Sequence, residues 1–207
     1  MKNCIARTAA LAVAFISVPP LAHADQITPP PVPVKLQVAA GSKAFLVGHA
    51  TGTQNYICLP SGTGFAYALF TPEATLFSEQ FKQLTTHFFS VNPNPADNGA
   101  IRATWQHSRD TSSVWAKLAV DGSSTDPAFV RPGAIAWLLL DVVGTQEGPS
   151  GGDTLTVTTQ IQRLNTSGGV APATGCSQST DVGKKAFVPY TADYFFYLIP
   201  DGDDDSN

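Results

Sequence analysis

The chain has 207 residues, of which 43% are apolar and only 14% are charged. That length suits one domain, and the low charge, with 17 glycines and 16 prolines, favours a turn-rich architecture over a helical one. A coiled coil, a helical bundle and a collagen are excluded. Because twelve basic residues stand against sixteen acidic ones without any Lys/Arg cluster, we expect neither nucleic acid nor an anionic membrane surface as a partner.

Residues 1–24 have the features of a secretory signal peptide. Lys2 and Arg7 precede an apolar run over residues 9–18, and residues 22–24 (AHA) match a small-x-small cleavage pattern. The apolar run is shorter than the ~20 residues that a helix needs to cross a bilayer. We therefore expect cleavage after Ala24, a secreted or periplasmic protein, and no membrane span.

The remaining chain has low-complexity ends around one domain. Residues 25–33 are Pro-rich and predict an extended arm, because proline fixes φ and removes a backbone donor. Residues 201–207 predict a disordered acidic tail. Its alternating aspartates imitate the opening of a calcium loop but lack the later glycine and glutamate, so we expect no calcium site. Residues 34–200, which contain no repeat or linker, form the domain.

Hydrophobic alternation with a period of two dominates this domain. It predicts strands over residues 101–107, 114–120 and 155–162. The runs 134–140 and 194–199 are apolar almost throughout, which predicts strands covered on both faces. We expect an all-β fold, either an antiparallel β-sandwich or a closed barrel, with about nine to eleven strands.

One segment favours a short helix near residues 72–83. Thr71 is a suitable N-cap, Pro72 suits the first helical position, and Phe77 and Phe81 follow at helical spacing.

Two cysteines, Cys58 and Cys176, remain after loss of the signal. In an oxidising compartment such a pair most simply forms a disulfide. Two free thiols or a shared metal are the alternatives, which the lack of a CxxC motif and of a nearby histidine disfavours. The bridge would close a loop of roughly 120 residues and stabilise the fold by up to ~4.9 kcal/mol.

Several motifs together resemble one known family. They are GTQNYIC at 52–58, GAIAWLLL at 133–140, IQRLNT at 161–166, GGVAP at 168–172 with Gly175-Cys176, and VPYTADYFFY at 188–197. From about residue 44 to 198 the chain resembles the secreted domain-of-unknown-function family numbered 3455. The resemblance implies a secreted single domain with both cysteines in its motif set, and it implies no activity. The chain departs from the family pattern at Arg102 to Trp105, and residues 90–100 look like an insertion.

Two motifs suggest enzymes that the rest of the sequence does not support. Some fungal members of the family are labelled malate dehydrogenase-like, but residues 62–67 lack the third glycine of a dinucleotide loop and no βαβ unit surrounds them. We therefore expect no cofactor. Residues 148–152 (GPSGG) fit G-x-S-x-G, yet they join two strands instead of a strand and a helix, so we interpret them as a hairpin turn.

The candidate catalytic residues are His87 and Asp193. His87 matches a histidine of the family pattern. Asp193 begins an apolar strand, where a carboxylate either accepts backbone hydrogen bonds or performs chemistry. Arg163 is the expected salt-bridge partner of Asp193. No two histidines have the spacing of a metal site, so we expect no metal.

The candidate binding residues are Trp105, Trp115, Tyr190 and Arg163. An exposed Trp115 would offer a stacking platform for a sugar, and the alternative is packing within the sheet. Pro189 cannot donate to a strand ladder, so we expect a bulge or sheet edge there that presents Tyr190 and Asp193 together.

These features predict an exported, monomeric β-domain that is not an enzyme and that binds a small molecule, a glycan or an envelope component. The alternative is a small secreted hydrolase that uses His87 and Asp193. A concave pocket lined by both residues would favour the hydrolase, whereas an open surface bearing Trp115 would favour binding.

Overall fold

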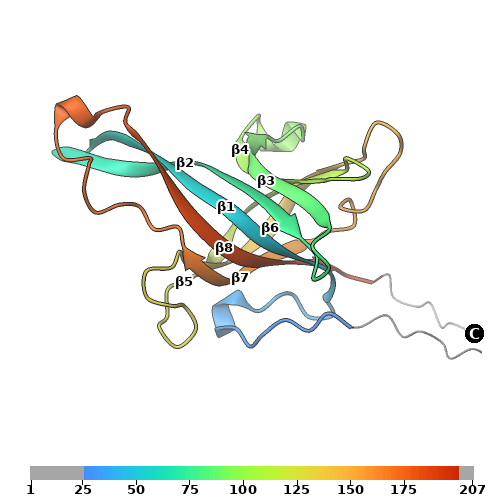
Figure 1. Cartoon of the computed structure of the whole chain (residues 1–207). Coiled ribbons are helices and arrows are strands. Elements are labelled where there is room, and N and C mark those ends of the chain that lie inside the picture. The colour runs from blue at the N-terminus through green and yellow to red at the C-terminus, as the bar shows by residue number, and fades with distance from the viewer. Residues whose placement is uncertain (1–25, 201–207) are drawn as a thin grey trace, which may run out of the picture.

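Eight antiparallel strands follow one another around a closed barrel (Figure 1). The computed structural model describes residues 26–200, so the predicted signal peptide and acidic tail lie outside the described residues. The strands are β1 (Lys43–Ser61), β2 (Gly64–Phe77), β3 (Gln83–Val91), β4 (Ile101–His107), β5 (Ser113–Ser124), β6 (Trp137–Gln146), β7 (Gln160–Gly168) and β8 (Lys185–Leu198). β8 closes the barrel against β1. The all-β prediction is confirmed as a barrel, and the expected nine to eleven strands are corrected to eight.

The helix predicted near residues 72–83 is wrong. Residues up to Phe77 belong to β2, and β3 begins at Gln83 after a tight turn. Phe81 lies in that turn with a φ of 58° and is 88% exposed, so the helical spacing of the two phenylalanines does not mark a buried face. Pro72 is accommodated beside a register shift in the β1–β2 ladder, between Asn55 and Tyr56. The described helices are short 3-10 turns: η1 (Val34–Leu36), η2 (Pro95–Asp97) and η3 (Ser179–Asp181).

The strand predicted over residues 155–162 is only partly correct, because β7 begins at Gln160. Leu155 is fully buried, but it lies in a turn whose backbone is held by the β4–β5 connection. The Leu155 N–H donates to Ser112 Oγ at 3.1 Å, and the Thr154 N–H donates to Asp110 Oδ2 at 3.0 Å. These bonds take the place of a strand ladder in the first half of the segment.

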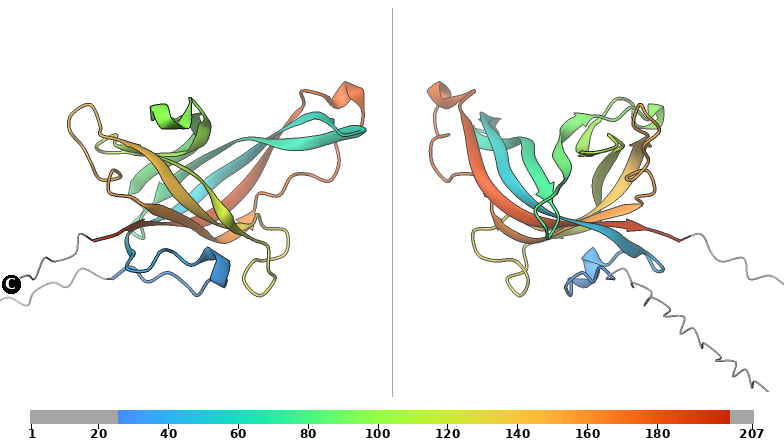
Figure 2. Two further views of the ribbon diagram at one scale, coloured as in Figure 1. Left: turned by 180° about the vertical axis from the view of Figure 1, so that it is seen from behind. Right: turned by 45° about the vertical axis from the view of Figure 1, so that its right-hand side comes forward.

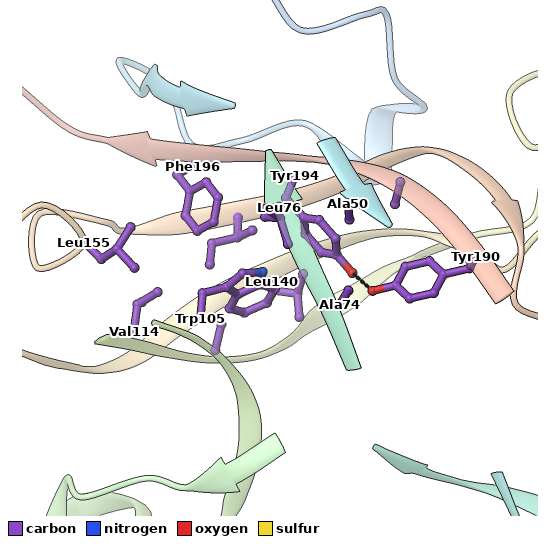
Figure 3. Packing of buried hydrophobic residues seen from close by; sticks show 13 residues of the cluster. Ala50, Ala74, Leu76, Trp105, Val114, Leu140, Leu155, Tyr190, Tyr194 and Phe196 are labelled. Carbon is purple, nitrogen blue, oxygen red and sulfur yellow. Dashed lines mark hydrogen bonds between the residues drawn. The ribbon is translucent and has the colours of Figure 1, made fainter. Parts of the chain in front are cut away.

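One face of the strands fills the barrel with apolar and aromatic side chains. Trp105, Leu140, Tyr194 and Phe196 converge there from β4, β6 and β8 (Figure 3). All four are nearly inaccessible to solvent. The inner face of the barrel is therefore both the core of the protein and the wall of the pocket described below.

The outer face of β6 and β8 is also buried, as their apolar runs predicted. Trp137, Leu139, Phe195 and Tyr197 form a second cluster outside the barrel. It is covered by the N-terminal segment 26–38, which crosses below the barrel in Figure 2 and contributes the fully buried Leu36. The Pro-rich arm thus packs against the barrel, through Ile27 and Val32 among others.

β1, β2 and the first half of β8 extend beyond the barrel as a long arm (Figure 1). At this arm Cys58 forms a disulfide with Cys176, with the Cα atoms 5.5 Å apart, which confirms the predicted bridge. Backbone hydrogen bonds join Cys58 to Gly183 and Lys184 at 2.9 Å each. The β7–β8 connection is thereby fastened to β1. Within residues 26–200 no helix is long and apolar enough to cross a membrane.

Candidate functional site

A pocket of about 300 Å³ lies against the inner face of the barrel. Its lining residues come from all eight strands: Gln54, Leu69, Pro72, His87, Phe89, Ile101, Arg102, Ala103, Trp105, Ala116, Lys117, Leu118, Leu138, Leu140, Arg163 and Tyr194. Nine of them are large aliphatic or aromatic residues or proline, and two more are the alanines Ala103 and Ala116. Leu69, Ile101 and Leu118 are also substantially exposed, so apolar side chains continue from the pocket to solvent.

His87 is a neutral side chain inside this pocket. Its ring is buried between Trp105, on which it stacks, and Tyr194, whose ring centroid lies 5.2 Å away. The Nδ1 atom lies 2.9 Å from Thr104 O, and because a carbonyl can only accept, Nδ1 carries the proton and Nε2 is left as an acceptor. Burial lowers the pKa of His87 to about 3, so the imidazole is uncharged at neutral pH.

Arg163 also belongs to the inner face. In the ladders it stands opposite Leu138 of β6 and Tyr194 of β8, both of which line the pocket. Its Nε and Nη2 donate to the carbonyl oxygen of Ala136 at 3.2 and 2.9 Å. The expected salt bridge with Asp193 is not formed, because Asp193 pairs with Leu164, the next residue of β7, and so lies on the opposite face.

Asp193 is part of a polar cluster on the outside of the barrel. It accepts hydrogen bonds from His49 Nδ1 and Asn165 Nδ2, each at 2.7 Å, and His49 Nε2 lies 3.0 Å from Glu79 Oε1. Burial lowers the pKa of His49, but the hydrogen bond to Asp193 and the charges of Asp193 and Glu79 outweigh it and raise the pKa overall. His87 and Asp193 are therefore not brought together in one site.

The candidate aromatic residues are buried. Trp115 faces outward, but it is only 6% exposed and its Nε1 donates to Ser90 Oγ at 2.8 Å. The packing alternative for the tryptophans is thus the one found. Tyr190 is buried on the inner face with its hydroxyl 3.3 Å from that of Tyr194 (Figure 3), so it is not presented beside Asp193. Pro189 pairs with Thr53 of β1 without a register shift, and the shift in the β7–β8 ladder lies between Leu164 and Ser167, opposite Thr191 to Asp193.

The sequence did not predict two features of these sites, the contact of His49 with Asp193 and the place of Gln54 in the pocket. His49 was considered only as a histidine without metal-site spacing, and its contact with Asp193 follows from the β1–β8 register, in which the two residues are paired. Gln54 was not singled out at all, although it is only 2% exposed and lines the pocket. A buried glutamine in an alternating strand is the signal that could have identified it.

The G-x-S-x-G motif is a packed loop between β6 and β7 and has no nucleophile elbow. Asp110 accepts hydrogen bonds from Ser112 and Thr154 and lies 2.9 Å from His107 Nδ1. A Cβ at Gly152 would lie 2.2 Å from the Cβ of Asp110, so this glycine is required by close packing. Within residues 26–200, no group of three or more His, Cys, Asp or Glu side chains could hold a metal ion.

These features define a closed eight-stranded antiparallel barrel with a mainly apolar interior pocket. The chain belongs to the family described as Protein of unknown function (DUF3455), whose model matches residues 39–198. The family inferred from the motifs is therefore confirmed. No curated protein and no solved structure matches the chain significantly.

Proposed function

We propose that this protein is a non-catalytic binding module that holds one small, largely apolar molecule inside its barrel. The observation that carries the proposal is the pocket of about 300 Å³ on the inner face. This volume is at the lower end of the ~300–1,000 Å³ found for small-molecule sites. A closed barrel of eight strands is also of the size that can enclose one small ligand.

The walls favour an aliphatic or aromatic ligand over a glycan. Phe89, Leu138 and Leu140 offer hydrocarbon surface, and Trp105 and Tyr194 add aromatic surface. A sugar-binding platform would need an exposed tryptophan, and Trp115 is covered. Of the ligands expected from the sequence, a small molecule or a lipid-like envelope component therefore suits the pocket best.

The alternative of a hydrolase receives less support. Its two catalytic candidates, His87 and Asp193, lie on opposite faces of the barrel wall. A general base works best with a pKa near the operating pH, whereas burial holds the pKa of His87 at about 3. The separation of the two residues and the low pKa of His87 both agree with a protein that binds its ligand and does not react with it.

We also infer that the protein acts as a monomer outside the cytoplasm, after removal of residues 1–24. The signal-peptide pattern and the Cys58–Cys176 disulfide support this placement, because disulfides persist in oxidising compartments. Mass spectrometry of the exported protein should find an N-terminus at Asp25, and an intact residue 1–24 segment would contradict the inference.

The binding proposal is tested with the neutral fluorescent probe N-phenyl-1-naphthylamine, whose emission rises in apolar surroundings. The wild-type protein should bind it at one site, and Ala103→Trp, which fills the pocket, should weaken binding by about tenfold or more. Ala68→Trp is the matched control, because Ala68 is similarly half-buried but lies outside the pocket. Absence of binding to the folded wild type, or equal binding by Ala103→Trp, would refute the proposal.

A further inference from the structure

Three cationic residues line the pocket, and they differ in how their charge is balanced. Arg102 is engaged by Asp97, which accepts from its Nε at 2.7 Å and from its Nη2 at 2.6 Å. Lys117 is exposed and stands opposite Asp141 in the β5–β6 ladder. Arg163, in contrast, is paired by no carboxylate of residues 26–200.

The contacts of Arg163 leave much of its guanidinium without a partner. Among residues 26–200, its five N–H donors have one acceptor, the carbonyl oxygen of Ala136, which accepts from Nε and Nη2. No aspartate or glutamate lines the pocket, and His87 is neutral there. Arg163 is partly buried, and charges that are removed from water are normally paired and hydrogen-bonded, so this arrangement favours an anion beside Arg163.

Gln54 is a second and independent polar group in the same pocket. It is 2% exposed, and its side-chain amide makes no hydrogen bond to another residue within 26–200. Buried amides in proteins are generally hydrogen-bonded. The NH₂ group of Gln54 can donate to an anion, whereas the Nε2 lone pair of His87 cannot. The indole Nε1 of Trp105 is a further buried donor of the pocket that has no partner within residues 26–200.

We propose that Arg163 binds the head group of a small amphiphilic acid, a molecule with an apolar body and one carboxylate, whose body lies against Trp105, Leu138 and Leu140. Gln54 supplies a second donor. This inference rests on the proposed function and names its ligand class. A single guanidinium that already holds one carbonyl matches a monoanion better than a phosphate with two charges.

The test measures displacement of N-phenyl-1-naphthylamine by decanoate and, separately, by the uncharged 1-decanol at pH 7.5. Wild-type protein should bind decanoate more tightly than decanol. Arg163→Met should weaken decanoate binding by about 10- to 100-fold, the range expected for a charged hydrogen bond, and leave decanol binding unchanged. Arg109→Met is the control, since it removes an exposed arginine that lies outside the pocket and should change neither affinity by more than about twofold.

The outcomes separate this inference from the proposed function. If the neutral probe binds but wild-type protein does not prefer decanoate, or if Arg109→Met loses as much affinity as Arg163→Met, the role of Arg163 is refuted while the binding function stands. If the probe does not bind, the binding function itself fails. Thermal unfolding and circular dichroism establish that each variant is folded, and Arg163→Lys should recover part of the decanoate affinity.

A measurement on the wild type covers the case in which Arg163→Met does not fold. Decanoate labelled with ¹³C at its carboxyl carbon is titrated by NMR in the bound state. A cation beside the carboxylate should lower its pKa below the value in water. A raised pKa would mean that the acid binds in its neutral form against the apolar wall, and this would overturn the proposal.

Discussion

The imidazole of His87 lies stacked on the indole of Trp105, with ring centroids 4.2 Å apart and ring planes inclined by 10°. The two residues face each other in the β3–β4 ladder, so the strand register alone brings their side chains into contact. The stack excludes water from the imidazole, and the Thr104 carbonyl holds Nδ1. His87 is consequently a neutral part of the pocket wall.

Stability should therefore fall on acidification below pH 6.5. The pKa of His87 is lowered from 6.5 to about 3 by burial, so the unfolded chain binds one more proton than the native protein between these values. The free energy of unfolding should fall by about 1.4 kcal/mol per pH unit in that window. Urea unfolding from pH 6.5 to about pH 4.5 measures the slope, since carboxylates begin to titrate below that range. In His87→Phe this contribution should vanish, and an unchanged slope would contradict the argument.

The His49–Asp193 pair should make stability depend on pH in the direction opposite to that of His87, and Asp193→Asn should remove this contribution. The pKa of His49 is raised above 6.5, mainly because the Asp193 hydrogen bond and charge outweigh burial. A raised pKa stabilises the fold below pH 6.5, and this contribution is lost as the pH rises through the folded value. Asp193→Asn should lower the pKa of His49 in an NMR titration and cost less than about 1 kcal/mol, because the pair is partly exposed. Loss of probe binding in the folded Asp193→Asn variant would instead show that the outer cluster acts on the pocket.

Gly152→Ala should destabilise the protein by about 1–3 kcal/mol or more, as overpacking does. The new methyl group would lie 2.2 Å from the Cβ and 2.6 Å from the carbonyl oxygen of Asp110. Ser150→Ala, at an exposed position of the same loop, is the control and should stay within about 0.5 kcal/mol of the wild type. Equal stability of the two variants in urea unfolding would show that the glycine is not needed for packing.

Reduction of the Cys58–Cys176 disulfide should lower stability by up to about 5 kcal/mol, because the bridge spans 118 residues and restricts the unfolded chain. Cys58→Ala/Cys176→Ala protein should match the reduced wild type in thermal unfolding. Two alkylatable thiols in the unreduced wild-type protein would contradict the bridge.

Leu36→Ala should cost about 2–5 kcal/mol, the usual range for truncating a fully buried leucine. Leu36 packs in the apolar cluster outside the barrel that contains Trp137 and Phe195. Its carbonyl oxygen accepts a hydrogen bond from Gln162 Nε2 at 2.6 Å. Val34→Ala is the matched control in the same 3-10 turn, because Val34 is 81% exposed. If both variants unfold at the same denaturant concentration, the N-terminal segment does not stabilise the barrel.

The sequence by itself determined the local properties of this protein. Alternation of polar and apolar residues marked β4 and β5, and the uninterrupted apolar run ending at Leu140 predicted the coverage of β6 on two faces. These features depend on neighbouring residues, whose side chains alternate across a strand whatever the rest of the chain does. The motifs were sufficient to assign the family, and the two remaining cysteines were sufficient to predict the disulfide.

Only the tertiary structure decided which of these residues meet. Arg163 and Asp193 belong to adjacent strands, but a difference of one residue in register places their side chains on opposite sides of the barrel wall. The register of β8 against β1 pairs Asp193 with His49, 144 positions away in the chain. The pocket exists because β8 closes against β1, and closure depends on the pairing of all eight strands, which no single segment encodes.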